Sequence, residues 1–583
     1  MIDYSAIDRA IGQNWFAADP NLKLQIERYV GEADRAAAIE RLQQVGAQMG
    51  GVIAENADVI DREPPVLRRY SREGDEINAV DHPAAGADSR RILWRLGLRY
   101  GARGELAPAA YLALRYMLAQ ADTGLLCAMG MTESVAELIE RYGDSSTCEA
   151  LLPKMRVAEW DEGHTGSMFI TERAGGSDVG AAETVARLGD DGRWRLSGLK
   201  WFCSNVDGDV IATVARPEGA PAGVKGVALF AVPRRRSDGS DNGVHIRRIK
   251  SKLGTRSVPT GEVELDGAEA YLLAGADGDA LDGRGVRRLM DMITDSRLGV
   301  ALMGAGIARR AFFEAAIYAS RRQAFGRRLV DHGMVREQLL MMQSEVEGCA
   351  AMLFACGELA AGERRGDLSD EQRGLSRMLV PLTKARTCRR GIDVASAALE
   401  IYGGNGYIND WPMARQYRDA QCHTIWEGTE NILALDVLRA LKRDAGPPFV
   451  AALSRTARAV GEAGPACAPL AKALAAGVGQ IGEVFGWAAS ADVAQVMTRA
   501  RRIADLLADV VQVSMLAEEA LFELEARGNA RKAVLATWLA RQRIAAQPLR
   551  GITSNDRILD EGFEPLLRYG EISADAAAKL YGA

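Results

Sequence analysis

The hydrophobic period of the sequence changes twice along the chain, and this change limits the folds that it can adopt. Residues 161–280 contain short β-rich runs such as VIATVA and GVALFAV, separated by Gly, Pro and Asp. Such runs are typical of an antiparallel barrel or sandwich. On both sides of this segment apolar residues recur at i, i+3 and i+4, which indicates helices. Because strands and helices do not alternate, a Rossmann-type sheet is disfavoured.

These segments predict an α+β multidomain protein with four parts. In chain order we expect an N-terminal mostly helical domain (1–160), a central antiparallel β-barrel or sandwich domain (161–280), a four-helix bundle (281–444) and an additional C-terminal helical domain (445–583). Long helices are predicted over 292–322, 334–361 and 377–402.

Local signals in the first part make more detailed predictions. Ser134 and Glu137 have the spacing of a capping box, so a helix is predicted to begin there, with Gly143 as its left-handed C-cap. Residues 61–89 contain paired prolines and mixed charge without a helical period, which predicts a loop.

Composition excludes several classes of protein. The 72 Lys and Arg against 78 Asp and Glu give a net charge of −6, so no global positive field attracts nucleic acid. The first residues lack the basic and then apolar order of a signal peptide, and no run approaches the roughly 18 apolar residues that span a bilayer. We therefore expect a cytoplasmic protein without a membrane span. The 8 Cys and 5 His lack metal-ligand spacing, so no metal site is predicted.

Two familiar patterns are better explained by structure than by chemistry. Ser197 and Lys200 match S-x-x-K, but they lie in a predicted strand without the companion elements of serine acyltransferases. Gly304 and Gly306 begin a G-x-G pattern inside a predicted helix rather than after a strand. Close helix packing is the expected role of these glycines.

Two stretches in the β-rich segment have the residue types of a cofactor site. In MFITERAGGSD (168–178) a strand leads into a glycine-rich turn, whose N–H groups and Ser177 hydroxyl suit a phosphate or a carbonyl-rich ring. In GLKWFCSN (198–205) strand alternation places Phe202 and Ser204 on one face, where a ring and a hydroxyl suit a flat heteroaromatic group. Each stretch alone is also compatible with an ordinary turn or strand.

Three further stretches lie in the later helical part: RQAFG (322–326), IYGGNGY (401–407) and IWEGTEN (425–431). In the last stretch, Thr429 can cap the helix that follows. Glu427 stands beside Ile425 and Trp426, and such apolar neighbours would make its carboxylate a stronger base.

Six motifs in this order resemble those of the acyl-CoA dehydrogenase flavoprotein family: TER-x-GGSDV, GLKWFCSN, KLGTRS, RQAFG, GGNGY and WEGTEN. The resemblance covers roughly residues 100–440 and implies a helical domain, a β-barrel and a four-helix domain. Residues 62–84 and the extra C-terminal helices are similar to those of the AidB-type branch of alkylation-response proteins.

The resemblance implies FAD as the cofactor and Glu427 as the catalytic base. It also implies a homotetramer, because Arg322, Phe325 and the Gly403–Gly404 turn would reach the FAD of a neighbouring subunit. The residues that the resemblance assigns to FAD are Met168, Thr171, Gly176, Ser177, Phe202, Ser204, Arg322, Phe325, Glu400, Gly403, Gly404, Trp426, Gly428, Thr429 and Asn431.

Two of these positions depart from the frequent family pattern. Glu400 stands where many members have Gln near the FAD pyrophosphate, although the AidB branch also has an acidic residue there. A second anion at this place requires a compensating cation such as Arg322. Phe202 replaces a frequent Trp beside the flavin, which is a milder change.

The implied reaction is the oxidation of an acyl-CoA or a related small molecule. Glu427 would abstract the α-proton while a hydride leaves the β-carbon for flavin N5. A minority branch of the family places its base at the position of Ser296, which cannot serve as a base here.

Two other functions stay open. One is an AidB-like alkylation-stress flavoprotein that associates with double-stranded DNA and has little ordinary acyl-CoA dehydrogenase activity. The other is a flavin oxidase of small molecules such as nitroalkanes, against which Glu427 argues because that branch uses Asp.

The charge of the C-terminal part bears on the DNA alternative. Residues 445–583 hold 15 basic and 15 acidic side chains and therefore carry no net charge, whereas DNA-binding domains are basic. A one-sided arginine stripe is still compatible with this balance, and a solvated helix face is the other interpretation. The candidate residues for such a stripe are Arg499, Arg501, Arg502, Arg541 and Arg543.

Overall fold

The computed structural model describes residues 1–100, 103–275, 278–545 and 551–581 of the chain. It is a helix-rich multidomain structure with an N-terminal helical part, a central β-barrel-like part and C-terminal helical parts, so the predicted fold class is confirmed. The chain forms two compact units, of which one comprises Met1–Gly51, Ala107–Ala121 and Val300–Ala583, and the other Val52–Leu106 and Asp122–Gly299. The four domain ranges expected from the sequence stay a prediction.

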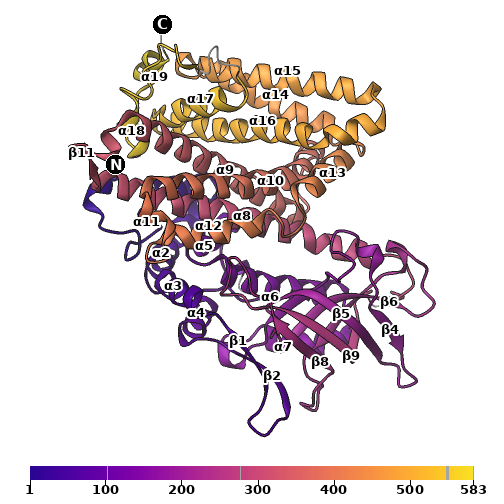
Figure 1. Ribbon diagram of the computed structural model, residues 1–583. Helices are drawn as coiled ribbons and strands as arrows, with labels where there is room; N and C mark the ends of the chain where they lie inside the picture. The colour runs from indigo at the N-terminus through magenta and orange to yellow at the C-terminus, as the bar shows by residue number, and fades with distance from the viewer. Residues whose placement is uncertain (101–102, 276–277, 546–550, 582–583) are drawn as a thin grey trace. The chain divides into compact units, whose positions relative to one another are not determined.

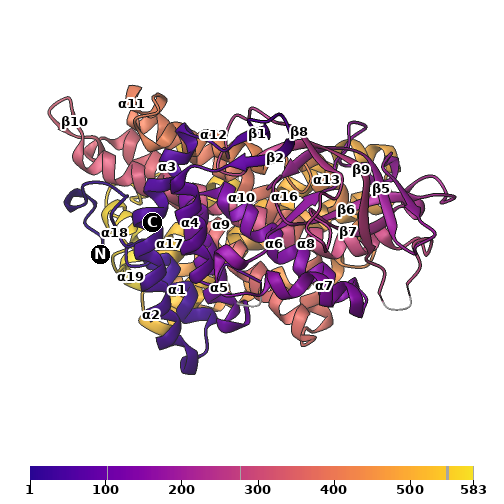
Figure 2. The ribbon, with the colours of Figure 1, turned by 90° about the horizontal axis from the view of Figure 1, so that it is seen from below.

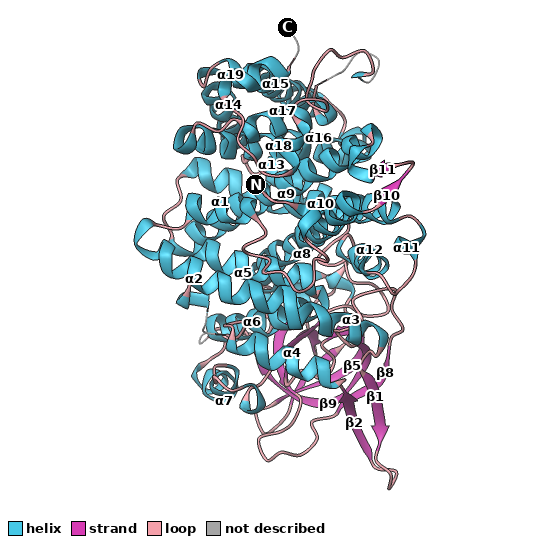
Figure 3. Ribbon diagram, turned by 90° about the vertical axis from the view of Figure 1, so that its left-hand side faces the viewer, coloured by secondary structure: helices cyan, strands magenta, loops and turns pink. Residues whose placement is uncertain are grey.

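The second of these units, the β-containing unit, is built around one seven-stranded sheet (Figure 3). The strand order is β3-β5-β4-β6-β7-β9-β8, and additional β3–β6 and β5–β9 pairings curl the sheet into a barrel-like form. Its interior is apolar, with Phe230, Ile246 and Val263 fully buried. The elements are α3 (Ala54–Arg62), β1 (Val66–Tyr70), β2 (Glu76–Asp81), α4 (Ala84–Arg95), α6 (Thr123–Tyr142), α7 (Ser145–Met155), β3 (Gly166–Phe169), β4 (Val185–Leu188), β5 (Trp194–Ser204), β6 (Val210–Pro217), β7 (Ala228–Pro233), β8 (Val244–Ile249), β9 (Thr260–Leu272) and the first turns of α8 (Gly285–Arg321).

The loop predicted for residues 61–89 is wrong. This segment forms the antiparallel hairpin β1–β2 and the start of α4. Arg68 of β1 pairs with Asp81 of β2 at 2.9 Å. Two of the oppositely charged residues on which the loop prediction rested therefore form a cross-strand ion pair.

The helix start predicted at Ser134 is also wrong, because α6 already begins after Asp122. The Asp122 carboxylate accepts a hydrogen bond from the N–H of Leu125 and another from the hydroxyl of Ser257 at 2.5 Å. This distant contact favours the earlier cap, and local sequence cannot reveal it. Gly143 does follow the helix, but its φ of −74° is not left-handed.

The first unit, the helical unit, contains the long helices that the sequence predicts. Helices α8, α9 and α10 confirm the three predicted segments, and α16 ends at the left-handed Gly528. The elements are α1 (Pro20–Tyr29), α2 (Glu32–Gln48), α5 (Pro108–Ala121), the rest of α8, the hairpin β10 (Gln323–Ala324) and β11 (Arg327–Arg328), α9 (Gly333–Arg365), α10 (Asp370–Tyr402), α11 (Gly404–Tyr407), α12 (Pro412–His423), α13 (Glu430–Leu441), α14 (Gly446–Glu462), α15 (Ala468–Ser490), α16 (Val493–Arg527), α17 (Arg531–Arg543), α18 (Phe563–Leu567) and α19 (Ala574–Leu580).

Helix packing explains the two glycines of α8. A Cβ on Gly304 would lie 2.7 Å from the Cα of Cys388 on α10, and one on Gly306 would lie 2.4 Å from the Cβ of Ala119 on α5. The structural role expected for these glycines is therefore confirmed.

Helix α9 is the core helix of this unit. Of the helices in the described part of the chain, α9 alone has the length and apolar composition that could cross a membrane. However, 94% of its most apolar stretch is buried inside the protein. The C-terminal helices α14–α17 lie as a layer over α9 and α10 (Figure 1).

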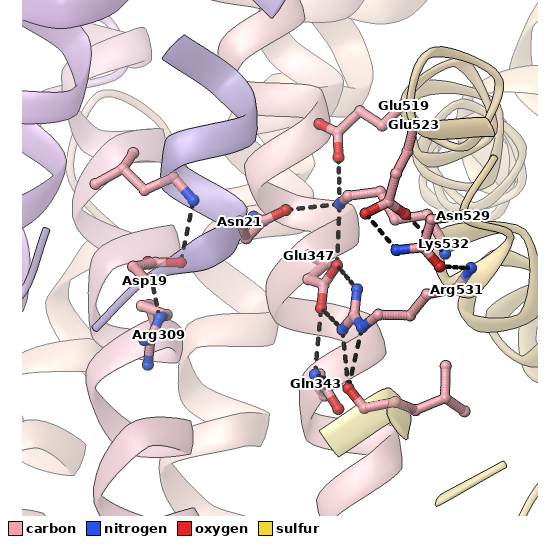
Figure 4. A network of polar contacts seen from close by, with 12 residues as sticks. Asp19, Asn21, Arg309, Gln343, Glu347, Glu519, Glu523, Asn529, Arg531 and Lys532 are labelled. Atoms are coloured by element: carbon pink, nitrogen blue, oxygen red, sulfur yellow. Dashed lines mark hydrogen bonds and ion pairs between the residues drawn. The ribbon is translucent and has the colours of Figure 1, made fainter. Parts of the chain in front are cut away.

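A buried network of charged side chains joins this layer to α9 and α1 (Figure 4). Glu347 of α9 accepts hydrogen bonds from Arg531 at 3.0 Å and Lys532 at 2.9 Å. The Lys532 ammonium also donates to Glu519 and to the side-chain oxygen of Asn21, both at 2.6 Å. Burial disfavours the ionised form of Glu347 and so acts to raise its pKa. The positive charges and hydrogen bonds of Arg531 and Lys532 outweigh this effect and lower the pKa of the carboxyl to about 2.

We expect the substitution Lys532→Met to destabilise the protein by about 3–5 kcal/mol, because it leaves the buried carboxylates of Glu347 and Glu519 without their shared cation. Urea unfolding measures this change. The same substitution at the exposed Lys579 is the control and should change the free energy of unfolding by less than about 0.5 kcal/mol. Equal effects of the two substitutions would contradict the role of the network.

Candidate functional site

Strand pairing in the β-containing unit brings the two β-rich motifs together. Met168 of β3 is the antiparallel partner of Ser204 of β5, and the N–H of Trp201 donates to the carbonyl of Thr171 at 2.9 Å. The alternation predicted for β5 is observed, and the ring of Phe202 is 55% exposed. An exposed ring beside a hydroxyl offers a surface for a planar ligand.

The glycine-rich turn next to this strand is accessible. Residues 173–178 are all exposed, and Gly175 has a φ of +138°, which favours glycine. A Cβ on Gly176 would lie 2.8 Å from Oγ1 of Thr171, so a larger residue would displace that hydroxyl. The backbone and Ser177 are therefore open to an anion or a polar ring.

A buried ion pair, which sequence reasoning missed, fixes the start of this turn. The Lys200 ammonium is fully buried and donates to the Glu172 carboxylate at 2.7 Å. The same carboxylate accepts from the N–H of Glu183 and from the hydroxyl of Thr184, both at 2.6 Å. Burial acts to raise the pKa of Glu172, but the charge and hydrogen bonds of Lys200 and Thr184 lower it overall. Lys200 thus has a structural role. The sequence indicates this role only by placing a lysine inside a predicted strand.

In the helical unit, the RQAFG motif forms the hairpin β10–β11, which projects from the end of α8 (Figure 2). Phe325 lies at its tip with a φ of +51°, and its side chain is 97% exposed. Arg322 is also exposed. The hairpin therefore presents a large apolar side chain to solvent.

The GGNGY motif forms an exposed turn at the end of α10. Gly403 has a φ of +59°, and Gly403, Gly404 and Glu400 all face solvent within this unit. Tyr407 is 84% exposed. Behind the turn, the ring of Tyr402 stacks on that of Tyr318 with a centroid distance of 4.2 Å, which anchors the turn to α8.

Glu427 lies in the turn between α12 and α13 with a φ of +55°, and Gly428 follows with a φ of +102°. Its side chain is half-buried, and Ile425 is 64% exposed, so the apolar surroundings expected for Glu427 are only partly present within this unit. Thr429 is the N-cap of α13 as predicted, but its hydroxyl makes no capping hydrogen bond. Trp426 packs edge-on against His423.

The five C-terminal arginines do not form one free basic stripe. Arg499 lies over the ring of Trp487, and Arg502 is exposed. The other three are paired with carboxylates of the same unit: Arg501 with Glu430, Arg541 with Asp556 and Arg543 with Glu345.

Comparison with known proteins identifies the family. The adaptive response protein AidB N-terminal domain matches residues 7–162, the acyl-CoA dehydrogenase middle domain matches 167–268, and the acyl-CoA dehydrogenase C-terminal domain matches 283–442. The AidB protein of Escherichia coli strain K12 is 33% identical over 70% of this chain and 74% of its own length. Acyl-CoA dehydrogenase family member 11 of Caenorhabditis elegans is 34% identical over 54% of this chain and 51% of its own length.

A solved structure extends the match to almost the whole chain. Caenorhabditis elegans ACDH-11 in complex with C11-CoA covers 94% of this chain and 95% of its own, with a TM-score of 0.84 and 25% identity. The chain belongs to the acyl-CoA dehydrogenase family, as its motifs predicted, and its N-terminal part is of the AidB type.

FAD is the cofactor of this family of oxidoreductases, and the β-containing unit fits it. The exposed ring of Phe202 offers a flat face for the flavin. The Ser204 hydroxyl, at the end of the same strand β5, lies 3.0 Å from the Thr260 hydroxyl at the start of the neighbouring strand β9. The accessible glycine turn next to them suits the polar edge of the ring or the pyrophosphate.

We expect Lys200→Met to weaken FAD binding at least tenfold, because the unpaired Glu172 would disturb the turn that begins at Thr171. Flavin fluorescence on release measures the dissociation constant. The control is Lys225→Met at an exposed position of the same unit, which should retain FAD. The double variant Lys200→Met, Glu172→Gln should bind FAD better than Lys200→Met alone, and a weaker affinity would exclude the ion pair as the cause.

Proposed function

We propose that this protein is an FAD-dependent acyl-CoA dehydrogenase-like enzyme in which Glu427 removes the α-proton of the acyl chain. The observation that carries the proposal is the conformation of Glu427, a residue other than glycine with a φ of +55°. Such strain persists only where the surrounding structure imposes it, and it is frequent at functional sites. This position is also the one at which the family motif has its base.

In the proposed oxidation of an acyl-CoA, the turn that carries Glu427 would provide both a base and a hydrogen-bond donor. A thioester acidifies its α-carbon, so the Glu427 carboxylate can take the proton as a general base. The enolate-like carbonyl oxygen needs hydrogen-bond donors, and in this family the N–H of the base residue supplies one. Bound FAD would accept the hydride from the β-carbon at flavin N5.

We assign the remaining FAD contacts to the motif residues of this chain. Their support is the exposure of the motif turns and the pairing of β3 with β5. The residues assigned to FAD are Met168, Thr171, Gly176, Ser177, Phe202, Ser204, Glu400, Trp426, Gly428, Thr429 and Asn431. In addition, Arg322, Phe325, Gly403 and Gly404 would reach the FAD of a neighbouring subunit.

We propose acyl-CoA as the substrate class and a homotetramer as the assembly. The complex of the similar ACDH-11 with C11-CoA supports the substrate. The exposure of Phe325 (97%) and of Tyr407 (84%), each on a motif turn of the helical unit, supports a subunit contact, because exposed apolar surface is available to a second subunit.

The alternative of an AidB-like alkylation-stress protein has support from the AidB N-terminal domain match. We do not extend it to duplex DNA, because three of the five candidate arginines are paired with carboxylates. The cytoplasmic location stays a prediction from the sequence.

The test of the proposed base is Glu427→Gln. Gln is nearly isosteric, so FAD should stay bound, while the rate of flavin bleaching by acyl-CoA should fall about 10²–10⁴-fold. Stopped-flow absorbance measures the rate, and Glu363→Gln at an exposed site of α9 is the control. Wild-type rates in Glu427→Gln would assign the base elsewhere. A wild type that no acyl-CoA reduces would overturn the dehydrogenase proposal.

The test of the assembly is Arg322→Ala. If its guanidinium holds the FAD of a neighbouring subunit, this change should lower FAD content and loosen the tetramer together. Light scattering after gel filtration gives the mass, and Arg458→Ala at an exposed position of α14 is the control. Loss of FAD from an unchanged tetramer, or a monomeric wild type, would refute the shared site.

A further inference from the structure

A bulge interrupts strand β5 between the two buried residues Lys200 and Cys203. Their partners on β9 are Val263 and Gly261, so three steps along β5 correspond to two steps along β9. Both side chains are fully buried, although strict alternation would place residues three apart on opposite faces. The bulge therefore lies at the aromatic pair between them, which includes the exposed Phe202. Bulges re-aim side chains and are frequent next to active sites.

One ammonium contacts both rings of this aromatic pair. Lys250, which follows β8, has its Nζ atom 3.7 Å from the ring centroid of Trp201 and 4.8 Å from that of Phe202. Both distances lie within the roughly 6 Å over which a cation is attracted to the face of an aromatic ring. Neighbouring residues of a regular strand point to opposite faces, so the bulge explains how both rings meet a single cation.

The position of Lys250 is fixed by its backbone and by its side chain. Its N–H donates to the carbonyl of Thr260 at 2.8 Å, and its ammonium donates to the Glu262 carboxylate of β9 at 2.7 Å. The side chains of Lys250 and Glu262 are only 10% and 9% exposed. A charge-assisted hydrogen bond with so little access to water restricts the ammonium to one place. The aromatic pair therefore meets a fixed cation.

Glu262 does not cancel the charge of Lys250, because a second cation shares this carboxylate. Arg248 of β8 donates to the same oxygen at 2.9 Å. The hydrogen bonds of Arg248 and Lys250 lower the pKa of the Glu262 carboxyl to about 2, so it is ionised at neutral pH. The three side chains together carry one net positive charge. The exposed Arg173 of the glycine turn adds a further cation, 5.6 Å from the ring centroid of Trp201.

We propose that Lys250 is a positioning residue of the FAD site: it holds the Phe202 ring, and its charge favours the reduced cofactor over the oxidised one. The inference rests on the proposed function, because it takes Phe202 as a contact of the flavin. In that reaction the α-proton goes to Glu427 and a hydride, with two electrons, goes to the flavin, which gains one negative charge with it. A nearby cation attracts this added charge, which only the reduced ring carries, and so raises the reduction potential.

The experiment measures the reduction potential of FAD bound to the full-length protein by equilibration with a reference dye, so it needs no acyl-CoA. Flavin fluorescence gives the affinity for FAD in parallel. Lys250→Met removes the charge from a chain of similar length, whereas Lys250→Arg keeps the charge. Glu262→Gln removes the opposing charge but keeps an oxygen that accepts a hydrogen bond from Lys250.

We expect Lys250→Met to weaken the binding of reduced FAD about tenfold more than that of oxidised FAD, which is the effect of one unit charge at roughly 10 Å within a protein. This tenfold difference lowers the potential of a two-electron couple by about 30 mV. Lys250→Arg should retain the wild-type potential. Glu262→Gln should raise the potential, because it leaves both cations without their shared carboxylate.

Two further variants serve as controls. Lys225→Met removes the same charge at an exposed position of the same unit and should leave the potential unchanged. Phe202→Leu tests the contact with the cofactor. If the flavin stacks on this ring, the substitution should lower the affinity for FAD about twofold to tenfold. An unchanged affinity would place the flavin elsewhere and overturn the inference.

A purely structural Lys250 would change the stability of the protein without changing the potential of its FAD. An unchanged potential in Lys250→Met or in Glu262→Gln would therefore overturn the inference. A fall in potential in both variants would also overturn it, since a charge effect requires opposite signs, and so would an equal fall in Lys250→Arg. If Lys250→Met does not fold, the direction of the change in Glu262→Gln decides.

The same measurements separate this inference from the proposed function. If FAD binds but no acyl-CoA reduces it, the dehydrogenase proposal fails, while the dye still measures the potentials and decides the role of Lys250. A wild type that binds no FAD would refute both.

Discussion

Three lysines without access to water hold separate segments of this chain in place. An ammonium taken out of water is stable only when acceptors surround it, so each buried lysine imposes a fixed arrangement on its neighbours. Lys200 binds Glu172 at the glycine turn, and Lys384 binds the carbonyl of Gly428 beside Glu427. Lys532 binds Glu347 and so joins the C-terminal helices to α9.

The segments that these lysines hold include the ones that carry the proposed chemistry. The glycine turn and the Glu427 turn are loops, and loops gain precision only from the contacts at their ends. A buried ion pair or charge-assisted hydrogen bond supplies such a contact with a defined direction. The strained φ of Glu427 is consistent with this view, because strain requires a rigid frame around it.

The C-terminal helices, which follow the residues matched by the acyl-CoA dehydrogenase domains, are an integral part of the helical unit. Their arginines are largely used in that attachment: Arg543 pairs with Glu345 of α9, and Arg501 pairs with Glu430 at the start of α13. The second pair connects the added helices to the helix that follows Glu427.

The sequence by itself determined the order of helical and β-rich parts, the family, the cofactor and the position of the candidate base. These features depend on short-range signals: the hydrophobic period, turn glycines and motifs of a few residues. The tertiary structure alone decided the start of α6, the hairpin in residues 61–89 and the partners of the buried lysines. The reason is physical, since these depend on polar and charged side chains that meet only in the folded chain, from Arg68 and Asp81, 13 residues apart, to Lys532 and Asn21, 511 residues apart. No local pattern marks which of many carboxylates or amides will share a buried site.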